Sequence, residues 1–132
     1  MQGTDNSWYL SHDFLGREAA AGSVFLDYRN SSFFTDDVSI IYGHRMNSNL
    51  MFSDVARYRD AEYFAQHDSG LLTLRNGKKY QLQAIGFQRI SVDDKLYREL
   101  HLSNNGAGII VLSTCDRSEH EKRDVLILRK VQ

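Results

Sequence analysis

The chain has one cysteine, no proline and no excess of charge of either sign. A single cysteine, Cys115, cannot form a disulfide within the chain, and one thiol cannot assemble a structural zinc site. With 16 basic and 17 acidic residues the formal net charge is -1, so no basic surface is available to neutralise phosphates and we expect no nucleic-acid partner. Cys115 is therefore either a small buried hydrophobe or a nucleophile.

Long hydrophobic runs are missing as well. No segment approaches the roughly 18 apolar residues that can span a bilayer, and residues 1–6 lack the charged and apolar regions of a signal peptide. Proline-rich linkers, low-complexity stretches and internal repeats are also absent from the sequence. We therefore expect residues 1–132 to form one soluble domain with a single core.

Alternating and continuous apolar runs predict a mostly β protein. The strands are expected at residues 23–28, 38–42, 71–74, 80–85, 109–115 and 125–131. The dipeptide Asn76-Gly77 is typical of a tight turn between two paired strands. The last two strands are apolar at alternate and intervening positions, which is typical of strands buried on both faces. The pattern predicts a closed or sandwiched sheet.

The middle of the chain changes to helical spacing. Met51, Phe52, Val55 and Tyr58 recur with that period, and Asp60 is placed to cap a second helical stretch. Small helices are therefore expected between the strand that ends at His44 and the Asn76-Gly77 hairpin.

Cys115 and Arg123 are expected to face each other. If the last two strands form a hairpin, these two residues flank its loop, and opposed residues have Cβ atoms about 4.5–5.5 Å apart. The Arg123 guanidinium could then lie over the thiol or over an oxygen that gains charge beside it. A fixed donor at such a position contributes on the order of 10²–10³ in rate. Arg117 is the competing cation, but it lies inside the loop.

His44 stands out among the five histidines. It follows a strand and a glycine, a place from which a rigid scaffold projects a side chain into a site. The other four histidines lie in polar or turn-like sequence and are best explained as solvated surface residues. Alone, neither His44 nor Cys115 is specific, because a single strand cysteine is more often inert packing than a nucleophile.

Together, Tyr42-Gly43-His44, Leu112-Ser113-Thr114-Cys115 and Arg123 resemble the sortase transpeptidases of Gram-positive bacteria. The sortase signature is a histidine after a Tyr-Gly strand end, a Ser-Thr-Cys or Thr-X-Thr-Cys strand end, and an arginine that opens the last strand. Residues 6–10, 22–30, 41–46 and 51–52 are similar to conserved blocks of class B. The resemblance covers nearly the whole chain and implies a sortase-type closed β-barrel of about eight strands with a few short helices.

The resemblance implies a cysteine transpeptidase that needs no cofactor and no metal. Cys115 attacks the carbonyl of a Thr-Gly or Thr-Asn type bond in a short C-terminal sorting motif, Arg123 steadies the oxyanion, and His44 protonates the leaving amine. The resulting thioester passes to an amine of a peptidoglycan precursor or to a pilin lysine. The implied partners are the sorting-signal peptide of a surface protein and that amine, at the extracellular face of the Gram-positive cell membrane.

The sequence departs from class B in the segment before the cysteine strand. The family usually places a long helix there, whereas this chain has only residues 88–108, in which Leu96 and Tyr97 lie on one face of a short predicted helix. This segment forms a wall of the peptide groove in the family, so Leu96 and Tyr97 are predicted substrate contacts. Its acidic residues are interpreted as a solvated face rather than a calcium site.

Two further substrate contacts are predicted at the strand ends. Tyr42 precedes the catalytic histidine, and Ser113 lies two residues before Cys115 on the same strand face. For Tyr42 the alternative is core packing with a satisfied hydroxyl group. Membrane-bound sortases also carry an N-terminal signal-anchor, which is absent here, so we expect a soluble catalytic domain whose only link to the membrane is that missing anchor.

Two interpretations from other classes remain open. A cysteine hydrolase of another fold also needs Cys and His, but papain-like enzymes place the cysteine before the histidine, and the order here is reversed. A non-catalytic cell-surface β module would explain the strands and leave Cys115 as packing. Alkylation discriminates between them, because rapid modification of Cys115 in the folded protein favours a site and inertness favours the module.

Overall fold

The structure is a computed structural model, and it describes residues 1–46, 51–91, 108–115 and 122–131. The mostly β fold with few short helices is confirmed. The described elements in chain order are the 3-10 helix η1 (Trp8–Leu10), strands β1 (Phe25–Leu26) and β2 (Val38–His44), the 3-10 helix η2 (Ser53–Arg59), helix α1 (Ala61–Gln66), and strands β3 (Ser69–Thr73), β4 (Lys79–Ser91), β5 (Ile109–Cys115) and β6 (Lys122–Val131).

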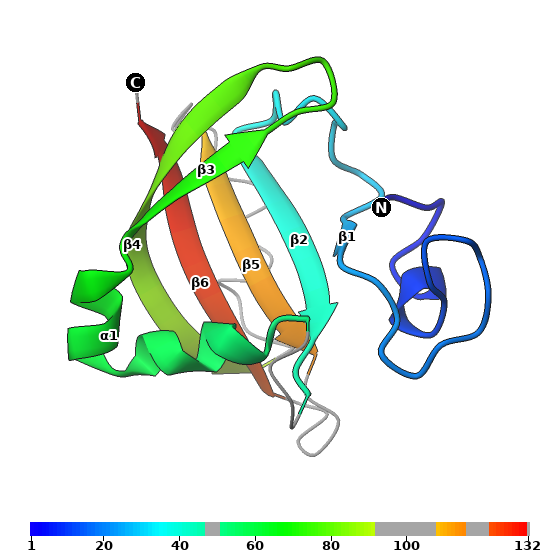
Figure 1. Ribbon diagram of the computed structural model, residues 1–132, viewed down its shortest axis with the longest axis horizontal. Coiled ribbons are helices and arrows are strands. Elements are labelled where there is room, and N and C mark those ends of the chain that lie inside the picture. The colour runs from blue at the N-terminus through cyan, green and yellow to red at the C-terminus, as the bar shows by residue number, and fades with distance from the viewer. Residues whose placement is uncertain (47–50, 92–107, 116–121, 132) are drawn as a thin grey trace.

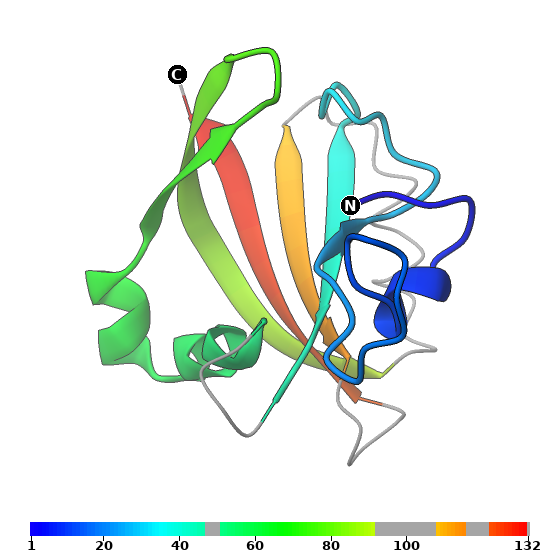
Figure 2. The same cartoon turned by 45° about the vertical axis from the view of Figure 1, so that its right-hand side comes forward.

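The strands form one six-stranded sheet in the order β1-β2-β5-β6-β4-β3 within the described ranges. Strands β2 and β5 are parallel, and the other neighbouring strands are antiparallel. Figure 1 shows that the sheet is strongly curved, with η2 and α1 across one side and the N-terminal segment on the other; Figure 2 shows the same curvature from a second direction. The parallel pairing places the ends of β2 and β5 together.

The predicted hairpins are present. β3 and β4 pair around the Asn76-Gly77 turn with Leu72 opposite Tyr80, and β5 pairs with β6. β4 is longer than expected, since it continues to Ser91 and pairs with β6 along most of its length.

Two expected elements differ in extent or type. The strand expected at 23–28 is reduced to Phe25–Leu26, because the chain turns at Asp27, whose carbonyl accepts from the Asn30 amide at 3.0 Å. The first predicted helix is a 3-10 helix. The predicted cap of α1 is confirmed, since the Asp60 carboxylate accepts from the Glu62 amide at 2.8 Å.

Each face of the sheet packs against a different part of the chain, because successive strand residues point to opposite sides. We call these the N-terminal face and the helical face. Side chains of the N-terminal face pack against Tyr9 and Leu10, and they are Val38, Ile40, Tyr42, Ile90, Val111 and Val125, with Phe25 from β1. Side chains of the helical face pack with Val55 of η2, and they are Leu82, Ala84, Ile110, Leu126 and Leu128.

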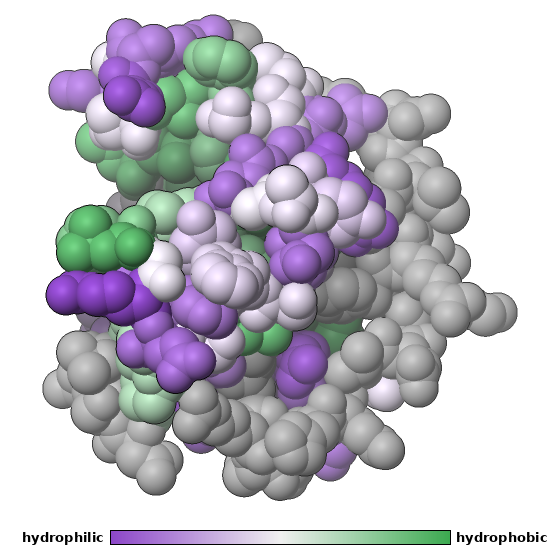
Figure 3. Space-filling model, turned by 90° about the vertical axis from the view of Figure 1, so that its right-hand side faces the viewer, coloured by the Kyte–Doolittle hydropathy of each residue, from purple (hydrophilic) through white to green (hydrophobic). Residues whose placement is uncertain are grey.

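The surface is mixed in character. The side of the molecule drawn in Figure 3 shows hydrophilic and hydrophobic residues interspersed, with hydrophobic areas toward its left. Among the described residues, no helix has the length and apolar character needed to cross a membrane.

Candidate active site

The candidate site begins with two paired residues at the ends of parallel strands. His44 and Cys115 are register partners in the ladder between β2 and β5, the last in a series that starts with Val38 and Ile109. Neighbouring strands lie about 4.8 Å apart, so the two backbones are adjacent although the residues are far apart in sequence. The topology thus brings the predicted histidine and the predicted nucleophile to one edge of the fold.

Arg123 lies on β6, the strand on the other side of β5 from β2. The β5–β6 register ends its regular pairing at Ser113 and Val125. One residue further, the Asp124 amide donates to Thr114 Oγ1 at 3.0 Å, so these two residues lie side by side. Cys115 ends β5 and Arg123 is the second residue of β6, so both follow directly on this pair, at the same end of the two strands. The side chain of Arg123 is half-buried, and its Nη1 lies 3.5 Å from the Lys122 carbonyl.

The imidazole of His44 is held by the N-terminal segment. Its Nε2 lies 2.5 Å from the main-chain oxygen of Leu10, and His44 is only 7% exposed. Because a carbonyl can only accept, Nε2 carries the hydrogen and donates it. Nδ1 is buried without a hydrogen-bond partner among the described residues. In the neutral ring Nδ1 is therefore the basic nitrogen, the one that can take up and release a proton.

Local packing fixes the carbonyl that holds His44. Leu10 ends the short helix η1, and the neighbouring Tyr9 carbonyl accepts from the Ser23 amide at 2.8 Å. Gly22 passes closely over this turn with φ +59, and a Cβ added there would lie 2.4 Å from the Tyr9 oxygen and 2.6 Å from the Leu10 oxygen. Only glycine allows this approach, since it accepts a positive φ and leaves room for both carbonyls.

Gly43 has a different packing reason. A Cβ at Gly43 would lie 2.8 Å from Cγ of Phe52, so the aromatic ring lies directly against the backbone between Tyr42 and His44. The Phe52 amide also donates to the His44 carbonyl at 3.0 Å. The chain that follows His44 therefore returns and packs on the strand end, which fixes the backbone of the histidine.

Tyr42 is part of a buried polar cluster around Asp27. Its hydroxyl donates to Asp27 Oδ2 at 2.9 Å, and Tyr42 is 8% exposed. Asp27 is fully buried and also accepts from Asn6 and from the Arg29 guanidinium. Burial raises the pKa of Asp27, but the hydrogen bonds from Arg29, Tyr42 and Asn6 outweigh it and hold the pKa well below its usual range. This geometry is that of core packing with a satisfied hydroxyl group, the alternative given for Tyr42 above. Contact between Tyr42 and the substrate stays a prediction.

The other predicted contacts divide into two groups. Ser113 is fully buried on β5 and is the register partner of Tyr42. Leu96 and Tyr97 lie outside the described residues, as does the competing cation Arg117. The roles of these residues in substrate binding or catalysis remain predictions.

Sequence reasoning missed the residues that position this site. Leu10 acts through its main chain, so its residue type carries no signal for the contact with His44. Asp27 and Asp124 were more accessible to prediction, because a carboxylate within or beside an apolar strand needs partners when it is buried.

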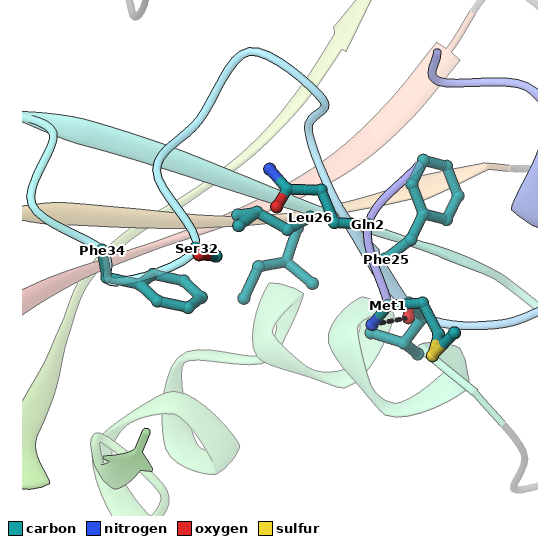
Figure 4. Close-up of a pocket in the computed structure, with 8 residues that line it drawn as sticks. Met1, Gln2, Phe25, Leu26, Ser32 and Phe34 are labelled. Carbon is teal, nitrogen blue, oxygen red and sulfur yellow. Dashed lines mark hydrogen bonds between the residues drawn. The ribbon is translucent and has the colours of Figure 1, made fainter. Parts of the chain in front are cut away.

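A separate cavity of about 290 Å³ lies between the N-terminus, β1 and the loop before β2. Figure 4 shows Met1, Phe25, Leu26 and Phe34 around it, and the Met1 amine donates to the Val24 carbonyl. None of its lining residues belongs to the predicted catalytic set. Over the described ranges, no group of three or more His, Cys, Asp or Glu residues is placed to hold a metal ion.

The sequence and the fold are similar to those of known sortases. Sortase B of Listeria monocytogenes is 31% identical over 154 aligned positions, which cover 99% of this chain and 63% of that protein. Sortase B of Staphylococcus aureus is 31% identical over 98 positions, covering 74% of this chain and 40% of that protein. The Staphylococcus aureus sortase B–substrate complex superposes with a TM-score of 0.84 at 25% identity, over 100% of this chain and 72% of that one.

A pilus enzyme shares the fold. Spy0129, a Streptococcus pyogenes class B sortase involved in pilus biogenesis, has a TM-score of 0.84 at 23% identity, over 99% of this chain and 82% of that one. No protein-family model matches the chain.

The chain belongs to the sortase family. Its relatives are class B proteins, as the sequence blocks predicted, and it spans less than two thirds of the length of the two curated relatives. The sortase fold is confirmed, which excludes a cysteine hydrolase of another fold.

Proposed function

We propose that this chain carries the catalytic centre of a cysteine transpeptidase that cleaves a sorting-signal peptide and joins it to an amine. The observation that carries the proposal is the register of the parallel strands, which pairs His44 with Cys115, and Arg123 lies near the start of the neighbouring strand β6. Family membership supports the same activity, and a relative of the same fold was determined as a substrate complex. The ends of three neighbouring strands, β2, β5 and β6, thus supply the nucleophile, the proton carrier and the cation of the proposed reaction.

In the first step the Cys115 thiolate attacks the carbonyl carbon of Thr in the sorting motif, at a Thr-Gly or Thr-Asn type bond. A carbon–sulfur bond forms, the carbonyl oxygen takes the negative charge, and the carbon–nitrogen bond then breaks. His44 gives its proton to the departing amine. With Nε2 donating to Leu10, the proton that moves is the one on Nδ1. The product is a thioester on Cys115.

Arg123 is the proposed stabiliser of the oxyanion. A guanidinium fixed close to the developing charge lowers the barrier more than a mobile cation, because it needs no reorganisation during the reaction. Arg123 lies near the start of β6 and is paired in register with Ile90 of β4, which holds its backbone in the sheet. Arg117 remains the competitor.

In the second step an amine attacks the thioester, loses a proton to His44 and releases Cys115. We propose an amine of a peptidoglycan precursor or a pilin lysine as acceptor, and the extracellular face of the Gram-positive cell membrane as the place of reaction. The pilus role of the structurally similar Streptococcus pyogenes enzyme favours keeping the pilin lysine among the candidates. Tyr42, Ser113, Leu96 and Tyr97 are the proposed contacts to the sorting peptide.

The test is a peptide library assay with a supplied amine, read by mass spectrometry. We expect cleavage after Thr in a subset of peptides and transfer of the acyl fragment to the amine. If wild type cleaves no peptide and Cys115 resists alkylation in the folded protein, the results would instead support a non-catalytic cell-surface β module.

A further inference from the structure

A second set of polar residues lies directly behind the proposed catalytic set. Arg45, Thr114 and Asp124 each adjoin one of its members in sequence: His44, Cys115 and Arg123, respectively. Alternation along the strands places Thr114 and Asp124 on the helical face, with Ile110 and Leu126, whereas His44 follows the residues of the N-terminal face. Three polar residues therefore gather near the ends of these strands on the other side of the sheet.

Asp124 is the centre of this set. It is 4% exposed, and its Oδ2 lies 3.6 Å from Nη1 of Arg45. Its Oδ1 is buried without a hydrogen-bond partner among the residues that the structure describes. The main chain of Asp124 is held by Thr114, whose Oγ1 accepts from the Asp124 amide at 3.0 Å and donates to its carbonyl at 3.3 Å.

The ion pair joins two strands that are not neighbours. Arg45 follows directly on β2 and Asp124 belongs to β6, and the sheet order places β5 between them. The pair therefore crosses behind β5, at the position of the fully buried Thr114. We propose that Arg45 and Asp124 form a clamp across the back of β5 that sets the positions of His44 and Arg123 relative to Cys115.

The physical basis is the desolvation of Asp124. A buried carboxylate is unfavourable unless a cation faces it, so the strand ends are stable only in the register that brings Arg45 over Asp124. A shift of β2 or β6 by one residue would separate the pair and leave the carboxylate buried without its cation. The clamp therefore specifies one relative position of the three strand ends. These are positioning residues, since neither is proposed to touch substrate.

This inference rests on the proposed transpeptidase function, and its test keeps the two apart. Wild type is assayed first for peptide cleavage, which tests the function alone. Arg45→Met, Asp124→Asn and the double variant are then compared with wild type for kcat, KM and the rate of Cys115 alkylation. We expect each single variant to lower kcat by about 10- to 100-fold with little change in KM, since a misplacement of about 1 Å can have that effect.

The double variant tests the pair as a unit. If the two residues act together, the loss of kcat in the double variant equals that of the more affected single variant rather than the product of both losses. Arg45→Lys keeps the positive charge and should recover part of the lost kcat. A purely structural role would give no such recovery at temperatures where all variants are folded.

Arg57→Met is the matched control. Arg57 Nη1 lies 3.6 Å from Asp54 Oδ1, the same separation as in the clamp, but both side chains are exposed on η2. This variant should leave kcat unchanged. Multiplicative losses in the double variant, or a kcat of Arg45→Met equal to wild type while wild type cleaves peptide, would overturn the clamp and leave the proposed function intact. Absence of cleavage by wild type would overturn the function itself.

Discussion

Nε2 of His44 donates a hydrogen bond to the main-chain carbonyl of Leu10, 34 residues earlier in the chain. The contact makes the N-terminal segment part of the candidate active site. It fixes the ring orientation and leaves Nδ1 as the nitrogen for proton exchange. In many cysteine and serine enzymes a side-chain amide or carboxylate orients the histidine, and here a backbone carbonyl has that position.

Gly22→Ala should lower activity through this carbonyl. The new Cβ would lie within 2.6 Å of the Leu10 oxygen, so the turn that holds His44 must shift. We expect kcat/KM to fall by about 10- to 100-fold. Gly16→Ala is the control, because Gly16 also has a positive φ of +78 but no heavy atom within 4 Å of an added Cβ. Equal losses in the two variants would show that backbone strain alone explains the effect.

Arg123→Lys should reduce turnover more than Arg117→Lys. Lysine keeps the charge but loses the planar fork of donors, so the substitution separates geometry from charge. We expect kcat to fall by about 10²-fold for Arg123→Lys, the scale of a lost oxyanion donor, and to change little for Arg117→Lys. A large loss at Arg117 with little loss at Arg123 would reverse the assignment.

Asp27→Asn should destabilise the fold in a pH-dependent way. The pKa of Asp27 is lower in the folded protein than its unfolded value of about 3.9. Its carboxylate therefore stabilises the fold above about pH 4, and this stabilisation is lost as the pH falls toward the folded-state pKa. At pH 7 we expect a loss of about 2 kcal/mol in the free energy of unfolding, the scale of hydrogen bonds to a charged group.

Urea unfolding of wild type and Asp27→Asn across pH 3–7 tests this prediction. The difference in unfolding free energy should be constant near neutral pH and shrink below about pH 4. Asp54→Asn is a suitable control, because Asp54 is exposed and its ion pair with Arg57 should contribute little at any pH. A difference between wild type and Asp27→Asn that does not vary with pH would contradict the low pKa of Asp27.

The local parts of the fold were predictable from sequence for physical reasons. The Asn76-Gly77 turn and the Asp60 cap depend on residues close in the chain, and both lie where the pattern placed them. The parallel pairing of β2 with β5 was not predicted, because it joins segments more than 60 residues apart and no local pattern encodes it. The adjacency of His44 and Cys115 was available only through the resemblance to sortases.

The supporting contacts of the site were the least predictable part. A main-chain acceptor such as the Leu10 carbonyl is present in every residue type, so nothing in the sequence distinguishes it. The Arg45–Asp124 pair crosses an intervening strand, so the strand order must be known before the two residues can be matched.

The most direct test of the mechanism is to measure the intact mass of the protein while it reacts with a sorting peptide that it cleaves, with no amine added. We predict a covalent adduct equal to the acyl fragment ending in Thr, attached to Cys115 and released when an amine is supplied. Cys115→Ala should be folded and should show neither adduct nor cleavage. Cleavage that continues in Cys115→Ala, or turnover of wild type without any adduct on Cys115 under single-turnover conditions, would contradict the nucleophile assignment.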